Sequence, residues 1–315
     1  MLRNLIVLLL FFSIVNAQDY IEENQKDNRD RLDIFQSKVS SSLKYISSKT
    51  DYFLSDYEIK NQNKTKKDIN DFFLQNDYYD KSNNSYLVYT FGYSYGAFEK
   101  LSTIHNLKIK IDLPHTKKKL RLIIDGEYDE DIKSIKNGDN TALALEYVVP
   151  FLDTTFRGGF KGISNPFVRV RVGLENNLKF FIFEPVQYFE YSKKHKYKET
   201  TKLYFDKRVD DSSLFELLLQ RSTQTEKIGT DLFAGLFYSI KYGTNKGVTY
   251  SLSTSAETKP DDNDNKIISH TIKATWRQTI FKKYIFVNIS PFIKYHRKYN
   301  YYREPFLMVT FDMKF

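Results

Sequence analysis

Short runs in which apolar and polar residues alternate fill the chain from residue 86 to its last residue. In residues 107–113, leucine and isoleucine alternate with Lys108, Lys110 and Asp112. The last run, residues 303–315, has the same pattern and ends on the aromatic Phe315. A period of two is typical of a β-strand with one apolar and one polar face.

About fourteen such runs follow one another, with twelve as the alternative count. The first begins at Tyr86 and the last is 303–315; the others are 107–113, 120–125, 141–149, 155–162, 167–174, 178–191, 197–208, 213–222, 230–242, 248–257, 267–280 and 284–296. Since single-chain outer-membrane barrels have an even number of strands of about ten residues, the count predicts an all-β fold, an antiparallel transmembrane β-barrel.

The gaps between the runs are also sorted by length. The even gaps include short turns, at 114–118, 150–154, 175–177, 243–247 and 281–283, and the odd gaps include longer loops, at 126–140 and 258–266. A soluble sandwich has no reason to sort its loops in this way, whereas outer-membrane barrels have short turns at one end and longer loops at the other. The terminal strand is expected to pair with the strand that begins near Tyr86, which leaves no open edge in lipid.

Four segments resemble a family of uncharacterised proteobacterial outer-membrane barrels. They are LPHTKKKLRLII at 113–124, NPFVRVRVGL at 165–174, SAETKP at 255–260 and the terminal strand. The resemblance covers about residues 101–315 and implies a bacterial outer-membrane location, with Phe315 as the signal for the barrel-assembly machinery. It implies no activity and no catalytic residues.

The first 85 residues do not alternate. Residues 1–17 have an early Arg3, an apolar run at 5–15 and a V-x-A site, which predict a cleavable signal peptide. Residues 18–85 are polar and predict a helical, partly disordered periplasmic segment, followed by the barrel domain at 86–315.

Within that segment, apolar residues at helical spacing predict an amphipathic helix at about 29–54, and a weaker pattern continues later. The helical positions are Leu32, Phe35, Val39, Leu43 and Ile46, followed by Ile69, Phe72 and Phe73. Three roles are open for this arm: loose packing or self-association, binding of a periplasmic protein, and a plug that enters the barrel.

Composition changes the picture little. Aromatic residues make up 16% of the chain, which suits aromatic belts at two membrane interfaces, and a chain without cysteine has no disulfides. A net charge of +9 would suit nucleic acid, but richness in Lys, Asn, Ile, Tyr and Phe is typical of AT-rich codon usage. We therefore expect no nucleic-acid partner, and expect outer-membrane lipid and lipopolysaccharide as surroundings.

Strand alternation places charged side chains in the barrel interior, because charges on the lipid face cost about 2–4 kcal/mol at mid-depth for Lys and Arg and less for Asp and Glu. The predicted basic residues are Lys108, Lys110, Lys119, Arg121, Arg169, Arg171, Lys273, Arg277 and Lys294. The predicted acidic residues are Asp112, Asp125, Glu146, Glu216, Glu257 and Asp312. Two hypotheses follow: a water-filled pore for small, preferably anionic solutes, or a closed structural or assembly barrel in which the charges pair across a narrow interior.

Catalytic and metal chemistry have weaker support. Ser269 and His296 are expected inward on neighbouring strands, but an outer-membrane hydrolase would also need an orienting group and an oxyanion site. The acidic loop 127–131 lacks the EF-hand pattern, and the histidines lack metal-ligand spacing. We predict no enzyme, no cofactor and no metal, and Trp276 is expected in an interfacial belt on the lipid face.

Overall fold

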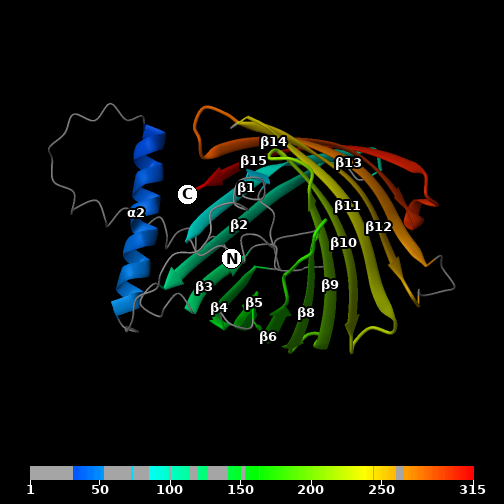
Figure 1. Cartoon of the computed structure of the whole chain (residues 1–315), viewed down its shortest axis with the longest axis horizontal. Helices are drawn as coiled ribbons and strands as arrows, with labels where there is room; N and C mark the ends of the chain where they lie inside the picture. The colour runs from blue at the N-terminus through cyan, green and yellow to red at the C-terminus, as the bar shows by residue number, and fades with distance from the viewer. Residues whose placement is uncertain are drawn as a thin grey trace.

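The computed structural model shows a β-barrel with a helix beside one end (Figure 1). It describes residues 31–52, 72–73, 85–98, 101–113, 120–125, 141–149, 153–162, 164–243, 245–259 and 266–315. The predicted signal peptide, Ile69, Lys119 and the acidic loop 127–131 lie outside these ranges.

Fifteen strands form the sheet. They are β1 (Tyr86–Gly96), β2 (Ser102–Leu113), β3 (Leu120–Asp125), β4 (Ala142–Val149), β5 (Thr154–Lys161), β6 (Asn165–Gly173), β7 (Asn176–Asn177), β8 (Ile182–Ser192), β9 (Lys196–Arg208), β10 (Ser213–Gln224), β11 (Thr230–Tyr242), β12 (Lys246–Glu257), β13 (Ile267–Thr279), β14 (Ile285–His296) and β15 (Arg303–Lys314). Each strand pairs antiparallel with its neighbours in sequence, except that the two-residue β7 pairs with β8 and not with β6, β6 pairs with β8 past it, and β1 pairs with β15. The sheet is therefore a closed barrel of fourteen strands with β7 as a short addition, which confirms the predicted fold class.

The barrel closes where the first and last strands meet. Val88 pairs with Lys314, and the register continues to Gly96 opposite Phe306. Gly92 is needed at this seam, because a Cβ there would lie 2.2 Å from the carbonyl oxygen of Val309. The closure predicted for the terminal strand is confirmed.

The two ends of the barrel differ. The proximal end holds the start of β1, the end of β15 and the turns 209–212 and 280–284. The distal end holds the connections that follow β1, β3, β5, β8, β10, β12 and β14, which include the long ones predicted from the sequence. A 3-10 helix, η5 (Arg297–Tyr299), forms part of the last distal loop.

The faces of the wall are sorted by polarity. On β4, the outward Leu143, Leu145 and Tyr147 are 41%, 46% and 44% exposed, while the inward Glu146 between them is 2% exposed. Trp276 on β13 is also outward, on the same face of the strand as the exposed Ile272. An exposed apolar outer face around a charged interior is the reverse of a soluble domain and is typical of membrane barrels.

Helix α2 (Arg31–Tyr52) lies close to the predicted range 29–54 and packs against the outside of the barrel. Its Val39 and Leu43 form a buried cluster with Ile109 and Ile111 of β2. None of the helices in the described ranges is long and apolar enough to cross a membrane.

Candidate functional site

The interior of the barrel holds most of the charged residues predicted for it. Those with 9% exposure or less are Lys110, Arg121, Arg169, Arg171, Arg277, Asp112, Glu146, Glu257 and Asp312. Five more are partly exposed and share the inward face of their strands: Lys108, Asp125, Glu216, Lys273 and Lys294. The strand pleat therefore places both sets toward one enclosed space.

Ion pairs on β2 to β5 run between neighbouring strands. Arg121 Nε lies 3.2 Å from Asp112 Oδ1, and Arg121 Nη1 lies 3.3 Å from Glu146 Oε1. Arg157 Nη2 donates to Glu146 Oε2 at 2.7 Å. These residues are direct register partners from β2 to β5. The charges thus pair along the wall and form a row perpendicular to the strands.

The row continues onto β9. Arg157 is opposite Arg169 in the register, Arg169 Nη2 donates to Glu190 Oε2 at 3.0 Å, and Glu190 is opposite Lys198. Lys161 Nζ also lies 2.5 Å from Glu190 Oε1. Buried carboxylates between guanidinium groups compensate charges that would be very costly alone.

Three arginines gather where β5 and β6 meet. Arg157 and Arg169 share a register position, and Arg171 lies two residues further along β6. Arg171 reaches Glu184 at 3.1 Å and Asp153 at 3.1 Å. All three side chains are buried on the inward face, and we call them the arginine cluster.

Aromatic rings support the same wall. The Tyr188 ring lies 5.4 Å from the Arg169 guanidinium carbon and 5.5 Å from Lys202 Nζ. Tyr188 itself packs with Val186 and Tyr204 in a buried cluster. The cations of β6 and β9 are therefore held by ring faces as well as by carboxylates.

The opposite wall, β11 to β15, has a different lining. The Phe292 and Phe306 rings stack at 4.5 Å with an interplanar angle of 4°, and Lys273 Nζ lies 5.9 Å from the Phe292 ring. Hydroxyl pairs also occur here: the Thr275 and Ser290 oxygens are 2.9 Å apart, and so are the Ser239 and Thr249 oxygens. This wall therefore combines rings and hydroxyl pairs with the ion pair between Arg277 and Asp312.

Near the proximal end, a polar cluster lies beside a ring from the N-terminal arm. Arg277 Nη1 donates to Asp312 Oδ2 at 2.5 Å and to Asn288 Oδ1 at 2.7 Å. Asn288 Nδ2 in turn donates to Thr310 Oγ1 at 2.9 Å. The Phe72 ring lies 6.0 Å from the Arg277 guanidinium carbon.

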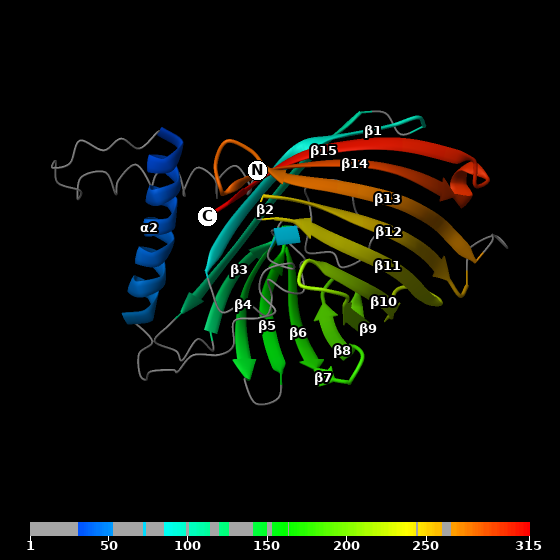
Figure 2. The same ribbon diagram turned by 45° about the horizontal axis from the view of Figure 1, so that its top comes forward.

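Phe72 and Phe73 lie inside the barrel, at its proximal end. Phe72 is 7% exposed, with its ring 6.0 Å from the Phe286 ring and 5.5 Å from Lys241 Nζ. A Cβ on Gly247 would lie 2.6 Å from the Phe73 ring, so that glycine leaves room for it. The short segment appears between the strands in Figure 2. Part of the arm that follows α2 therefore enters the barrel.

Sequence reasoning missed Arg157 and Lys161. Both alternate with the outward Phe156 and Phe160 on β5, so the rule that found the other interior residues would also have found them. It could not show that Phe72 lies inside the barrel, because helical spacing does not specify what a residue packs against.

Ser269 and His296 are register partners on β13 and β14, as expected for neighbouring strands. His296 Nδ1 accepts a hydrogen bond from the Lys298 backbone N–H at 3.0 Å and so caps η5. This contact gives that nitrogen a structural role in the distal loop.

The distal rim is tied together by ion pairs between loops. Glu257 pairs with Lys227 at 3.1 Å and with Arg297, so it links the loops that follow β10, β12 and β14. Partial burial lowers the pKa of Lys227, but hydrogen bonds to Asp231 and Glu257 outweigh it and raise the pKa above the ordinary lysine value. The lysine therefore remains a cation that fixes the rim.

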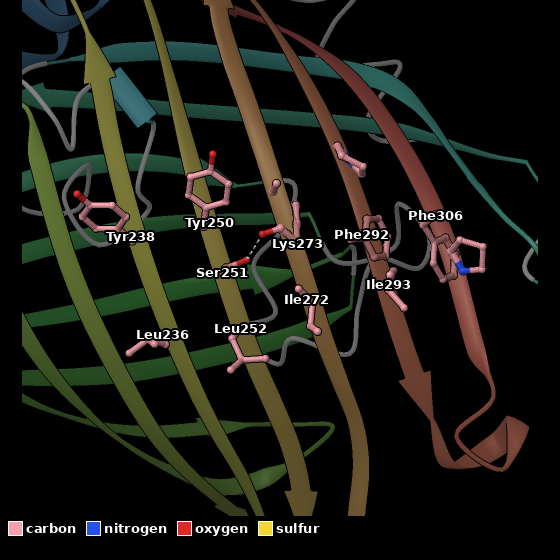
Figure 3. Close-up of a pocket in the computed structure, with 13 residues that line it drawn as sticks. Leu236, Tyr238, Tyr250, Ser251, Leu252, Ile272, Lys273, Phe292, Ile293 and Phe306 are labelled. Carbon is pink, nitrogen blue, oxygen red and sulfur yellow. Dashed lines mark hydrogen bonds between the residues drawn. The ribbon is translucent and has the colours of Figure 1, made fainter.

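An apolar groove of about 520 Å³ lies on the outer side of β11 to β15 (Figure 3). Tyr238, Tyr250 and Ile272 line one part of it, and Pro291 and Pro305 line another. Most of the lining residues are on the outward face of their strands, and the inward Lys273, Phe292 and Phe306, which alternate with them, also line the groove.

A scan against protein-family models finds no match, and a search of curated proteins finds none either. Solved structures give distant similarities. "KdgM porin" is 10% identical, with 72% of this chain and 99% of that chain covered and a TM-score of 0.35. "Anion-selective porin from Comamonas acidovorans" is 9% identical, with 74% and 99% covered and a TM-score of 0.45.

"High pH structure of Pseudomonas putida OprB" is 8% identical, with 74% and 94% covered and a TM-score of 0.47. Similarity at this level gives no information about the solute or activity of this chain. The resemblance to uncharacterised outer-membrane barrels stays a prediction.

Proposed function

We propose that this chain is a bacterial outer-membrane β-barrel that forms a narrow pore for small, preferably anionic solutes. The arginine cluster of Arg157, Arg169 and Arg171 is the place where an anion would be held on its way through. The N-terminal arm, through Phe72 and Phe73, narrows the pore at its proximal end.

The membrane part of this proposal is supported by the distribution of exposed side chains. Outward positions carry exposed Leu, Tyr, Val and Phe, including Val168 at 58% and Tyr191 at 47%. Closed barrels satisfy every backbone hydrogen bond between strands, which allows them to cross lipid. The signal peptide and the assembly signal at Phe315, both expected from the sequence, fit the same location. Lipid and lipopolysaccharide would then surround the barrel, and the barrel-assembly machinery would be a transient partner.

The anion preference is supported by one observation, the direct register pairing of Arg157 with Arg169 on the inward face. Rings of Arg and Lys side chains favour anions in pores. Each arginine has a carboxylate on its far side, Glu146 for Arg157 and Glu190 for Arg169. Because these carboxylates neutralise part of the positive charge of the arginines, we expect only a moderate preference for anions.

The reversal potential of full-length protein in a planar bilayer under a KCl gradient tests this selectivity. The double variant Arg157→Gln/Arg169→Gln should lower the anion-to-cation permeability ratio severalfold. Arg221→Gln is the matched control, because Arg221 is 53% exposed by side chain and alternates with the buried Gln220 and Ser222. An unchanged ratio in the double variant, with conductance retained, would remove the arginine cluster as the selective element.

The closed structural barrel remains the second candidate, and the burial of the interior favours it. Lys110 and Glu146 are 1% and 2% exposed, and Phe72 occupies the proximal end. The variant Phe72→Ala/Phe73→Ala should raise single-channel conductance if the arm narrows a pore. Absence of conductance steps in both the native chain and this variant would instead support a closed barrel whose residues 18–85 bind a periplasmic protein.

A further inference from the structure

Helix α2 crosses the strands at the proximal end of the barrel. Asp33 accepts hydrogen bonds from Lys282 Nζ at 2.5 Å and from Tyr284 at 3.1 Å, in the turn between β13 and β14. Two residues further along the helix, the Phe35 ring lies 5.8 Å from the ring of Phe315. The start of the helix is therefore fixed to the last three strands.

The next two turns of the helix lie over β2 and its neighbours. Val39 and Leu43 are each 5% exposed and bury Ile109 and Ile111, which point outward from β2. Partly buried residues of β1 and β3 complete the contact: Leu87, Leu120, Leu122 and Ile124. Because the contacts of the helix pass from the β13–β14 turn to β2, it runs around the barrel wall, as Figures 1 and 2 show.

The side of α2 that faces away from the barrel also carries large apolar residues. Ile34 is 36% exposed and Tyr45 is 59% exposed. Eleven residues separate them, about three helical turns, so they lie on one face, and Leu43 lies almost opposite Ile34. The helix therefore has an apolar contact on the barrel side, and its free side carries Ile34 and Tyr45 with Lys38 and Ser41 on the same face between them.

The strand surface beside the helix is continuous with the exposed outer face. Ile111 is opposite Leu122, and Leu122 is opposite Leu145 on β4. Ile111 is covered by α2, Leu122 is partly buried against the same cluster, and Leu145 is 46% exposed. The same row of outward side chains thus passes from beneath the helix to the open face that lipid would cover.

We infer that α2 is an interfacial helix that lies in the plane of the proximal membrane boundary, with Ile34 and Tyr45 against a lipid surface. This inference rests on the proposed membrane location of the barrel. A helix parallel to the membrane plane, with its apolar side in the boundary and Tyr at headgroup level, is a stable arrangement. Water around the free side would instead leave both apolar residues exposed.

Tryptophan fluorescence in phosphatidylcholine vesicles with brominated acyl chains tests the inference. The native chain contains one tryptophan, Trp276, which points outward on β13 and reports insertion of the barrel. In Trp276→Phe/Tyr45→Trp, the new indole should lose about half of its emission to bromine near the headgroups and should be protected from aqueous iodide.

The matched control is Trp276→Phe/Ile228→Trp, because Ile228 is 78% exposed in the distal loop after β10. Its indole should be quenched by iodide and unaffected by bromine. Migration on a gel before and after boiling checks that each variant has formed the barrel.

The outcomes separate the two proposals. If Trp276 of the native chain is quenched by bromine but the indole at position 45 is quenched only by iodide, the interfacial helix is wrong and the membrane barrel stands. If the indole at 45 is protected from both quenchers, protein covers it and the lipid contact is wrong. If bromine does not quench Trp276, the membrane location itself fails.

Discussion

The two walls of the barrel interior are built from different interactions. From β2 to β9, which we call the ionic wall, buried carboxylates and guanidinium groups alternate between register partners, as in Asp112, Arg121, Glu146 and Arg157. From β11 to β15, which we call the aromatic wall, the stacked rings of Phe292 and Phe306 and hydroxyl pairs lie beside the ion pair of Arg277 with Asp312.

The difference shows that the same alternation of inward and outward residues along the strands can produce two kinds of interior lining. Both walls satisfy the rule that polar or lumen-facing residues occupy every second position. A buried ion pair is sensitive to loss of one partner, since the remaining charge is left in a poor solvent. Rings and hydroxyls lose only contact area or one neutral hydrogen bond, so the walls should respond differently to matched substitutions.

The largest effect is expected at Glu146 on the ionic wall. Glu146→Gln keeps the side-chain size but removes the charge between Arg121 and Arg157, and should lower the free energy of unfolding by about 3–5 kcal/mol. Urea-induced unfolding in lipid vesicles measures it. In Glu146→Gln/Arg157→Gln the loss should be smaller than the sum of the single losses, because the uncompensated cation is removed as well.

A ring removed from the aromatic wall should have the next largest effect. Phe306→Ala deletes the ring that stacks on Phe292, and we expect a loss of about 3 kcal/mol in the free energy of unfolding, the low end of the range for Phe→Ala. The same unfolding measurement applies. A loss greater than that of Glu146→Gln would contradict the proposed contrast between the walls.

A hydroxyl of the aromatic wall should matter less. Ser290 is 0% exposed, and its oxygen lies 2.9 Å from that of Thr275. Ser290→Ala should cost about 1 kcal/mol, the usual net value of one neutral hydrogen bond. If this variant matched Glu146→Gln, ion pairing could not be what distinguishes the ionic wall.

The smallest effect is expected at Asp210, in the turn that joins β9 to β10. Its pKa lies below the ordinary value of 3.8 because its carboxylate accepts hydrogen bonds from the Ser212 N–H and from the Ser212 and Ser213 hydroxyls. Since the folded state favours the charged form, the stabilisation is present above the ordinary pKa and is lost as the pH falls through the folded value.

Asp210→Asn should therefore lower the urea concentration at the unfolding midpoint at neutral pH, and should have little effect at pH values well below the ordinary pKa of aspartate. Asp211→Asn is the control, since Asp211 accepts an exposed hydrogen bond from Arg208 at 3.0 Å. An equal shift for Asp210→Asn at both pH values would show that its carboxylate charge does not contribute.

Much of the fold could be predicted because alternation and turn length are local properties. Strand positions, the fourteen-strand closure and the inward face of residues such as Arg121 and Arg169 follow from a period of two. Pairing partners could not be assigned in the same way, because the pairs depend on the register between strands. Arg157, the partner of Glu146, was missed although its alternation is clear.

The N-terminal arm shows the limit more clearly. Its amphipathic helix was predicted from Phe35, Val39 and Leu43, but the surface that it covers was not, since Ile109 and Ile111 carry the same pattern as uncovered lipid-facing residues. The position of Phe72 inside the barrel was not predicted either, because the weak helical pattern around it allowed several roles for the arm.

The row of charges from Asp112 to Lys198 also has a consequence for assembly. Alternation forbids a strand from slipping by one residue, because every side chain would change face, but it permits a slip by two. Such a slip between β3 and β4 would place Arg121 opposite Ala144 or Val148 in place of Glu146. The ionic wall therefore disfavours registers that are shifted by two residues while the strands pair during assembly. Because the register between strands determines the tilt of the strands and the diameter of the barrel, these ion pairs select one barrel geometry among those that the apolar pattern alone would allow.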